Sequence, residues 1–102
     1  VRTGLSFEIP EGYHMKLFMR SSQGAKTKFY LANCVGIVDS SYRGEVMGIF
    51  KITAGRRIKK YIHKGERFMQ GLIEKNIPVE FEETDELSQT DRGEGGFGST
   101  GK

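Results

Sequence analysis

The sequence predicts an all-β sandwich or barrel. Short runs of β-branched and aromatic residues recur along the chain, and Gly, Pro, Asn, Asp or Ser bounds each run. With 102 residues, of which 36% are hydrophobic, the chain has the size of one small domain. A domain of this size buries a modest core, so a partner subunit would add to its stability.

The expected elements follow from local patterns. Apolar and polar residues alternate over residues 5–9, a turn follows at residues 10–12, and a second extended run covers residues 13–19. Further strands are expected over residues 28–31, over the apolar run beginning at residue 36, and over residues 45–53, 67–73 and 79–81. The one helical candidate is residues 56–63, where a strand or a short turn is equally consistent with the pattern.

The composition changes after residue 81. Residues 82–96 are acidic and then glycine-rich, and Leu87 is their only large apolar side chain. Such a segment cannot bury enough apolar surface to fold by itself. We therefore expect a β-barrel core over residues 1–81 and, over residues 82–102, an acidic linker with a flexible Gly-rich C-terminal arm.

Charge and cysteine content limit the function classes. The net charge is +3, but five Lys or Arg lie within residues 56–64 and eight Asp or Glu within residues 74–94. The basic segment is most simply a solvated turn, with a polyanion partner as the alternative. The single Cys34 has apolar neighbours and is expected to be a buried free thiol, which suits an intracellular, cytoplasmic location. No apolar run is long enough to cross a bilayer, so no membrane partner is expected.

The C-terminal segment RGEGGFGSTGK matches glycine-rich phosphate motifs by letter only, because those motifs need a preceding strand and a following helix. Glycines allow backbone N–H groups to approach an anion, Arg92 can donate two hydrogen bonds to a phosphate, and Phe97 can stack on a base. The combination indicates a flexible lid over a nucleotide, although a disordered terminus is the simpler interpretation of glycine alone.

Two further stretches suit the same ligand. Arg20, Ser21 and Ser22 follow a predicted strand, where a guanidinium and two hydroxyls could hold phosphate oxygens, although a capped turn with a surface arginine explains them equally well. Asp39 follows an apolar strand, and Tyr42 lies three residues later. An Asx turn accounts for Asp39, but its carboxylate could also take a proton from an attacking water.

Taken in order, MRSSQG, GIVDSSYRGEV, KGERFMQ and RGEGGFGSTG resemble the second to fifth motifs of the homotrimeric dUTP pyrophosphatases, or dUTPases. The resemblance covers nearly the whole chain from Thr3. It implies a jelly-roll-like β-barrel and a homotrimer whose active sites are shared between subunits. It also implies Mg²⁺-assisted hydrolysis of dUTP to dUMP and pyrophosphate, which keeps uracil out of DNA and supplies dUMP for thymidylate synthesis.

The resemblance also implies roles for individual residues. Asp39 would orient and deprotonate the attacking water, and Tyr42 would lie under the deoxyribose, leaving no room for a 2′-OH. The hairpin around Asn33 and residues 36–42 would present main-chain groups to the uracil edge. The arm of another subunit would close with Phe97 over the uracil. No protein ligand to the metal is implied. The full set of implied substrate-binding residues is Arg20, Ser21, Ser22, Asn33, Gly36, Val38, Tyr42, Gln70, Arg92, Phe97, Gly98, Ser99 and Thr100.

The sequence leaves one main alternative and argues against two others. The family's first motif should lie upstream of Val1, so we expect the chain to be the C-terminal majority of a longer protein, and a catalytically impaired dUTP-binding or regulatory protein is the main alternative. A dCTP deaminase would need a second arginine and a catalytic glutamate where Ala25 and Ile49 stand. A single-stranded nucleic-acid binder is unlikely on the sequence, because only Tyr61 interleaves the basic segment.

Overall fold

The structure is a computed structural model that describes residues 1–53 and 61–101. Short strands dominate it, which confirms the all-β class, and one helix of six residues interrupts them. In chain order the elements are β1 (Tyr13–Met19), α1 (Ser21–Lys26), β2 (Phe29–Leu31), β3 (Gly36–Asp39), β4 (Phe50–Ile52) and β5 (Met69–Lys75). Within the described ranges no helix has the length and apolar character that a bilayer crossing requires.

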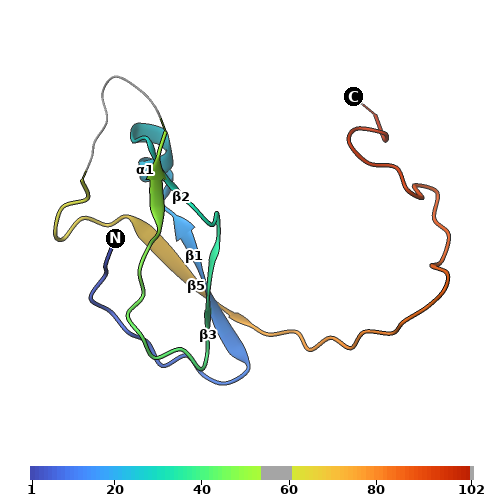
Figure 1. The fold of residues 1–102 in the computed structure, drawn as a ribbon, viewed down its shortest axis with the longest axis horizontal. Coiled ribbons are helices and arrows are strands. Elements are labelled where there is room, and N and C mark those ends of the chain that lie inside the picture. The colour runs from blue at the N-terminus through green and yellow to red at the C-terminus, as the bar shows by residue number, and fades with distance from the viewer. Residues whose placement is uncertain (54–60, 102) are drawn as a thin grey trace.

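The strands form two antiparallel sheets. One sheet has the order β3-β1-β5, and the other pairs β2 with β4 (Figure 1). In the part of the chain that the structure describes, these two sheets do not close into a complete barrel. A hydrophobic core cluster is formed by Ile9, Met15, Leu17, Val38 and Val46, with Met69 packed against it.

Strand β1 forms over the second predicted extended run, residues 13–19, with the expected bounds. Met15 and Leu17 are buried, whereas His14 and Lys16 alternate with them on the opposite face. The preceding turn depends on Gly12, whose φ of +83° is costly for a residue with a side chain. Its closure is fixed by the Tyr13 amide, which donates to the Pro10 carbonyl oxygen at 3.1 Å.

Two predicted strands are absent from the described structure. Residues 5–9 are extended but belong to no sheet, although the chain just before them pairs with the segment after Gly44 through an Arg2–Met47 bridge. Residues 79–81 have no strand partner, and their apolar side chains are exposed. Alternation gives the side-chain pattern of a strand, but a neighbouring strand is needed to complete its hydrogen bonds.

Two local predictions were wrong. Helix α1 replaces the turn expected after Arg20, and it buries Gln23 against the body of the protein. Cys34 is exposed rather than buried, because it occupies the turn between β2 and β3 with a φ of 61°. The helical candidate at residues 56–63 lies mainly outside the described residues. The predicted intracellular location stays a prediction.

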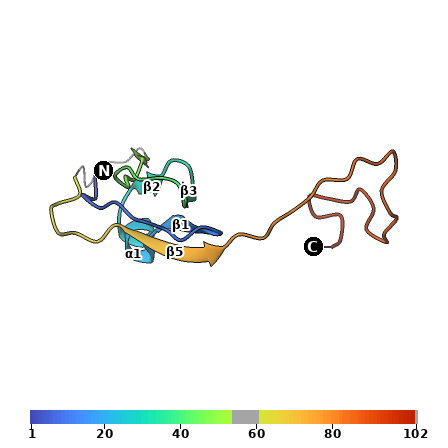
Figure 2. The same cartoon turned by 90° about the horizontal axis from the view of Figure 1, so that it is seen from below.

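The chain after β5 leaves the body and extends away from it, as both ribbon views show (Figures 1 and 2). The Cα radius of gyration is 19.2 Å. A compact domain of about 100 residues would have a value near ~13 Å. The difference follows from the extended C-terminal segment, which contains no strand or helix over residues 76–101.

Candidate active site

A cavity of about 260 Å³ lies beside β3 and the turn that follows it. Five of the residues expected to bind or act on the nucleotide line it together: Asn33, Gly36, Val38, Asp39 and Tyr42. Sequence reasoning placed these residues in one hairpin, and the structure brings them around one hollow. The hollow is the candidate base and sugar site.

Gly36 allows the close approach of backbone on which this cavity depends. A Cβ at this position would lie 3.3 Å from the Cβ of Leu17 and 3.6 Å from the side-chain nitrogen of Asn33. Leu17 is part of the buried core and cannot retreat freely. A larger residue at position 36 would therefore push β3 away from β1 or displace Asn33 into the cavity.

The turn after β3 holds Asp39 and Tyr42 close to each other. The Tyr42 amide donates to the Asp39 carbonyl oxygen at 3.1 Å, which closes the turn. The Tyr42 hydroxyl donates to the carbonyl oxygen of Glu45 at 2.9 Å. Asp39 is exposed, so its carboxylate is accessible to solvent and to a ligand.

Sequence reasoning missed Glu45, Met47 and Ile49, which line the same cavity. Glu45 accepts two hydrogen bonds from Arg2 at 2.9 and 2.6 Å and one from the Gly4 amide at 2.8 Å. The hydrogen bond from Arg2 is the main reason that the pKa of Glu45 lies below its ordinary value. The alternation of residues 45–49 was a usable signal, because it put Glu45, Met47 and Ile49 on one face.

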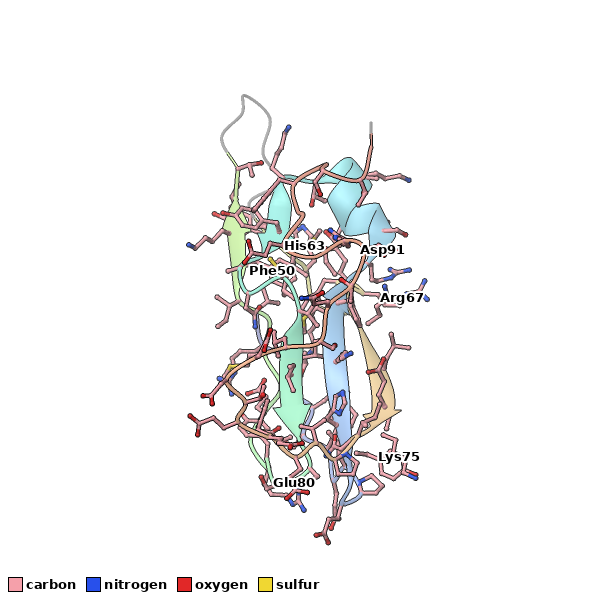
Figure 3. All side chains as sticks on the ribbon, turned by 90° about the vertical axis from the view of Figure 1, so that its right-hand side faces the viewer. Phe50, His63, Arg67, Lys75, Glu80 and Asp91 are labelled. Carbon is pink, nitrogen blue, oxygen red and sulfur yellow. The ribbon has the colours of Figure 1, made fainter. Side chains whose placement is uncertain are left out.

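The predicted phosphate-binding residues lie at a different place. Arg20 precedes α1 and donates from Nη1 to the Arg67 carbonyl oxygen at 3.2 Å. Ser21 and Ser22 begin α1, and Gln70 near the start of β5 donates to the Met19 carbonyl oxygen at 3.4 Å. These four residues therefore form a polar group at one end of the larger sheet. Figure 3 shows that end near the label of Arg67, with Lys75 at the other.

Asp39 lies at the opposite end of that sheet. In the strand register His14 pairs with Asp39, whereas Phe18 pairs with Gln70. Strands rise ~3.3 Å per residue, so these two rows are about 13 Å apart and Arg20 is about 20 Å beyond His14. Within one chain, the candidate general base Asp39 and the candidate phosphate-binding residues around Arg20 therefore do not come together.

The C-terminal residues form a third, separate group. Arg92 donates from Nε to the Gly95 carbonyl oxygen at 2.7 Å, and the Ser99 amide donates to the Gly96 carbonyl oxygen at 3.1 Å. Phe97 is fully exposed, with a φ of 51°. Gly98 and Thr100 lie in the same turns. In both ribbon views this C-terminal segment is remote from β3 (Figures 1 and 2). The structure thus places the arm residues together but away from the chain's own cavity.

Comparison with known proteins finds the chain similar to one family over nearly its whole length. A family model described as dUTPase matches residues 1–101. The chain is 44% identical over 102 residues to the deoxyuridine 5′-triphosphate nucleotidohydrolase of Bdellovibrio bacteriovorus, covering all of the chain and 67% of that protein. It is 39% identical over 101 residues to the protein of the same name from Finegoldia magna, covering 99% of the chain and 69% of that protein.

Solved structures agree with the sequence matches. A mutant dUTPase of the 80alpha phage aligns with a TM-score of 0.77 and 27% identity, over 97% of this chain and 73% of that one. Another mutant of the Staphylococcus bacteriophage 80alpha dUTPase, solved with dUpNHpp, aligns with a TM-score of 0.74 and 26% identity, over 95% and 72%. These likenesses confirm the jelly-roll-like fold of the dUTPase type. The chain belongs to the dUTPase family.

Proposed function

We propose that this protein hydrolyses dUTP to dUMP and pyrophosphate. The relatives with about 40% identity carry the name of that activity, and the dUTPase family model matches nearly the whole chain. The single observation that carries the proposal is the cavity beside β3, where Asp39, Tyr42 and Asn33 meet. It offers the exposed carboxylate of Asp39 and one aromatic ring, whereas the second carboxylate of the cavity, that of Glu45, is hydrogen-bonded by Arg2.

The reaction we infer is an attack by water on the α-phosphorus. The water oxygen forms a bond to phosphorus as Asp39 accepts a proton from that water. The bond between the α-phosphorus and the bridging oxygen breaks, and pyrophosphate leaves with the electron pair. Phosphoryl transfer requires mainly positioning and electrostatic stabilisation, so a single well-placed carboxylate is sufficient as the base.

The pyrimidine and sugar would occupy the β3 cavity. Its lining by the hairpin backbone offers donors and acceptors for a uracil edge, with Asn33 and Val38 at its wall. Tyr42 would lie under the deoxyribose, where a 2′-OH would meet the ring.

A complete site requires a second copy of the chain. Asp39 and Arg20 are too far apart in one chain to contact the water and the phosphates of the same nucleotide, since each contact spans about 3 Å. Exposed apolar side chains also indicate that surface is covered in an assembly, among them Ile37 at 66% and Ile49 at 65%. We therefore propose a homotrimer in which Asp39 of one subunit faces Arg20, Ser21, Ser22 and Gln70 of a neighbour.

Residues 82–102 would act as the arm that closes the site. The described part of this segment is exposed and extended, so it can reach a neighbouring subunit without breaking a core contact. We propose that Phe97 covers the uracil and that Arg92, Gly98, Ser99 and Thr100 meet the phosphates. Closure would exclude bulk water and strengthen the contacts to the triphosphate.

Magnesium would enter as part of the substrate. No cluster of three or more His, Cys, Asp or Glu side chains that could hold a metal occurs among the described residues. Mg²⁺ usually keeps several waters and binds through substrate phosphates. A donor set without such a cluster fits a metal carried by the triphosphate, whose charge it would neutralise.

The test is the release of pyrophosphate from Mg–dUTP, with dTTP, UTP and dCTP as competing substrates. We expect turnover of dUTP alone. Tight dUTP binding without turnover would instead select the regulatory alternative, and ammonia release from dCTP would select deamination. Salt-sensitive retention of oligonucleotides, with no effect of dUTP, would select the nucleic-acid alternative.

A further inference from the structure

The turn that carries Asp39 and Tyr42 is held from within by Arg43. Its Nη1 donates to the Ser40 carbonyl oxygen at 2.6 Å and to the Tyr42 carbonyl oxygen at 3.2 Å. The Arg43 side chain therefore spans the turn and fixes the carbonyl groups on both sides of Ser41. Hydrogen bonds from a charged donor are stronger than neutral ones, so this clamp restrains the turn despite its exposure.

The ring of Tyr42 is held at its hydroxyl and occupies space that the missing side chain of Gly44 leaves open. Its hydroxyl donates to the Glu45 carbonyl oxygen at 2.9 Å. A Cβ added at Gly44 would lie 2.5 Å from the Tyr42 hydroxyl oxygen and 2.6 Å from the adjoining ring carbon. No φ in the left-handed region applies to Gly44, so an alanine there would be opposed by the ring and not by its backbone.

Glu45, whose carbonyl oxygen accepts the hydrogen bond from the Tyr42 hydroxyl, is itself held in place by its side chain. The Glu45 carboxylate is hydrogen-bonded by Arg2 and by the Gly4 amide. The ring is thus tied at its hydroxyl to a fixed residue and at its main chain to the turn that Arg43 spans. Both ends of the side chain are positioned before any ligand arrives.

We propose that Arg43 and Gly44 are positioning residues that set the selectivity of the site for deoxyribose over ribose. This inference rests on the proposed function. Arg43 would fix the backbone from which Tyr42 projects, and Gly44 would leave the space into which its ring settles. Rejection of a 2′-OH depends on where the ring lies relative to the sugar, so loosening the turn at position 43, or displacing the ring with a side chain at position 44, would let ribose enter.

If Arg43 had a purely structural role, its substitution would have different effects on stability and turnover. Its Nη2 lies 3.9 Å from Glu8 Oε1, and such an exposed ion pair contributes little to stability. If Arg43 served only the fold, its substitution would lower the thermal midpoint and reduce turnover of dUTP and UTP alike. Selectivity between the two sugars separates the roles, because folding defects act on both substrates equally.

The experiment compares the full-length wild type with Arg43→Gln, Arg43→Lys and Gly44→Ala. The ratio of kcat/KM for dUTP to kcat/KM for UTP is measured, together with equilibrium binding of dUpNHpp and UpNHpp and the thermal midpoint. Arg67→Lys is the matched control, because Arg67 is also an exposed arginine but lies outside the β3 cavity. Its selectivity should equal that of the wild type.

For Arg43→Gln and Gly44→Ala we expect the dUTP/UTP ratio to fall about tenfold, mainly through better use of UTP, which corresponds to about 1.4 kcal/mol. Arg43→Lys should restore part of the selectivity, because an ammonium can donate to one of the two carbonyls but cannot span both. Wild-type selectivity in either Arg43→Gln or Gly44→Ala would overturn the inference. Absence of dUTP turnover in the wild type would refute the proposed function. The ratio of dUpNHpp to UpNHpp binding, compared between the wild type and the variants, would still test the role of Arg43 and Gly44 in sugar selectivity.

Discussion

Residues 1–75 and residues 76–101 are built on different principles. In the first region β1 pairs along its length with β5 and along four residues with β3, and the buried core lies on its inner face. In the second region Asn76 is still hydrogen-bonded to Gly12, but the described chain beyond it forms local turns such as that from Gly93 to Thr90, and large apolar side chains such as Phe81 are exposed. Fold stability therefore resides in the first region, whereas the second supplies side chains for another surface.

This division separates the groups needed for chemistry. The body supplies the cavity with Asp39 at one end of its sheet and the phosphate group with Arg20 at the other. The arm supplies an aromatic ring and donors that no contact binds to the body. A substitution in the body can therefore abolish catalysis without unfolding the protein. Likewise, deletion of the arm should leave the stability of the core unchanged.

The largest expected effect is that of Asp39→Asn. The amide preserves the shape of the side chain but cannot accept the proton, so turnover of dUTP should fall by about a thousandfold, the middle of the range for general-base catalysis. Binding of dUpNHpp and the thermal midpoint should stay close to those of the wild type. Turnover equal to that of the wild type would exclude Asp39 as the base.

Removal of residues 93–102 should have the next largest effect on activity. Without Phe97 and its neighbours the nucleotide is not enclosed, and turnover should drop by roughly a hundredfold. The thermal midpoint should not change, since the described residues among them, 93–101, form hydrogen bonds only within the arm. A loss of stability comparable to that of a core mutation would show that the arm is a structural element. Calorimetry on both proteins gives the answer.

A pair of alanine substitutions compares the two regions directly. Leu17→Ala leaves a cavity among Met15, Val38 and Val46 and should lower the free energy of unfolding by about 2–5 kcal/mol. Phe97→Ala removes an exposed ring and should leave that free energy unchanged while weakening dUpNHpp binding. Chemical denaturation with matched binding titrations measures both. Equal destabilisation by the two changes would contradict the division.

The smallest expected effect is a pH dependence in the body. The hydrogen bond from Lys16 holds the pKa of Glu74 below its ordinary value, and Arg2 does the same for Glu45. A carboxyl whose pKa is lower in the folded protein stabilises the fold above its unfolded pKa, and this contribution is lost as the pH falls through the folded value. Glu45→Gln and Glu74→Gln should therefore be slightly less stable than wild type at neutral pH.

That difference should begin to shrink as the pH falls below about 4.3, the ordinary pKa of a glutamate carboxyl, and should disappear only once the pH is below the lowered pKa of the folded carboxyls. Glu80→Gln is the control, because Glu80 lies on the extended segment beyond β5. It should match the wild type at every pH. A stability gap that persists in acid would assign the effect to packing rather than to charge.

Local patterns predicted some elements better than others. The alternation of Tyr13–Met19 gave β1 with its bounds, because one face of that strand is buried and the other is not. Helix α1 was missed because Ser21, Ser22 and Gly24 favour turns, and the burial of Gln23 depends on tertiary packing. Strands predicted at residues 5–9 and 79–81 depend on partners that alternation does not identify.

The candidate site was predictable in composition and not in geometry. The sequence of the hairpin predicted that Asn33, Asp39 and Tyr42 lie together, and they line one cavity because they are close in sequence. The separation of Asp39 from Arg20 depends on the register of β1 with β3 and β5, which no local pattern contains. Glu45 and the Arg43 clamp were missed because their roles appear only in hydrogen bonds.

The most direct test of the shared site is complementation between two inactive chains. Asp39→Asn and Arg20→Gln are co-expressed, and the mixed oligomers are assayed for pyrophosphate release from dUTP. If each site takes Asp39 and Arg20 from different subunits, random mixing in a symmetric trimer should restore about a quarter of the wild-type activity. Activity no greater than that of the two variants alone would contradict a site built between copies.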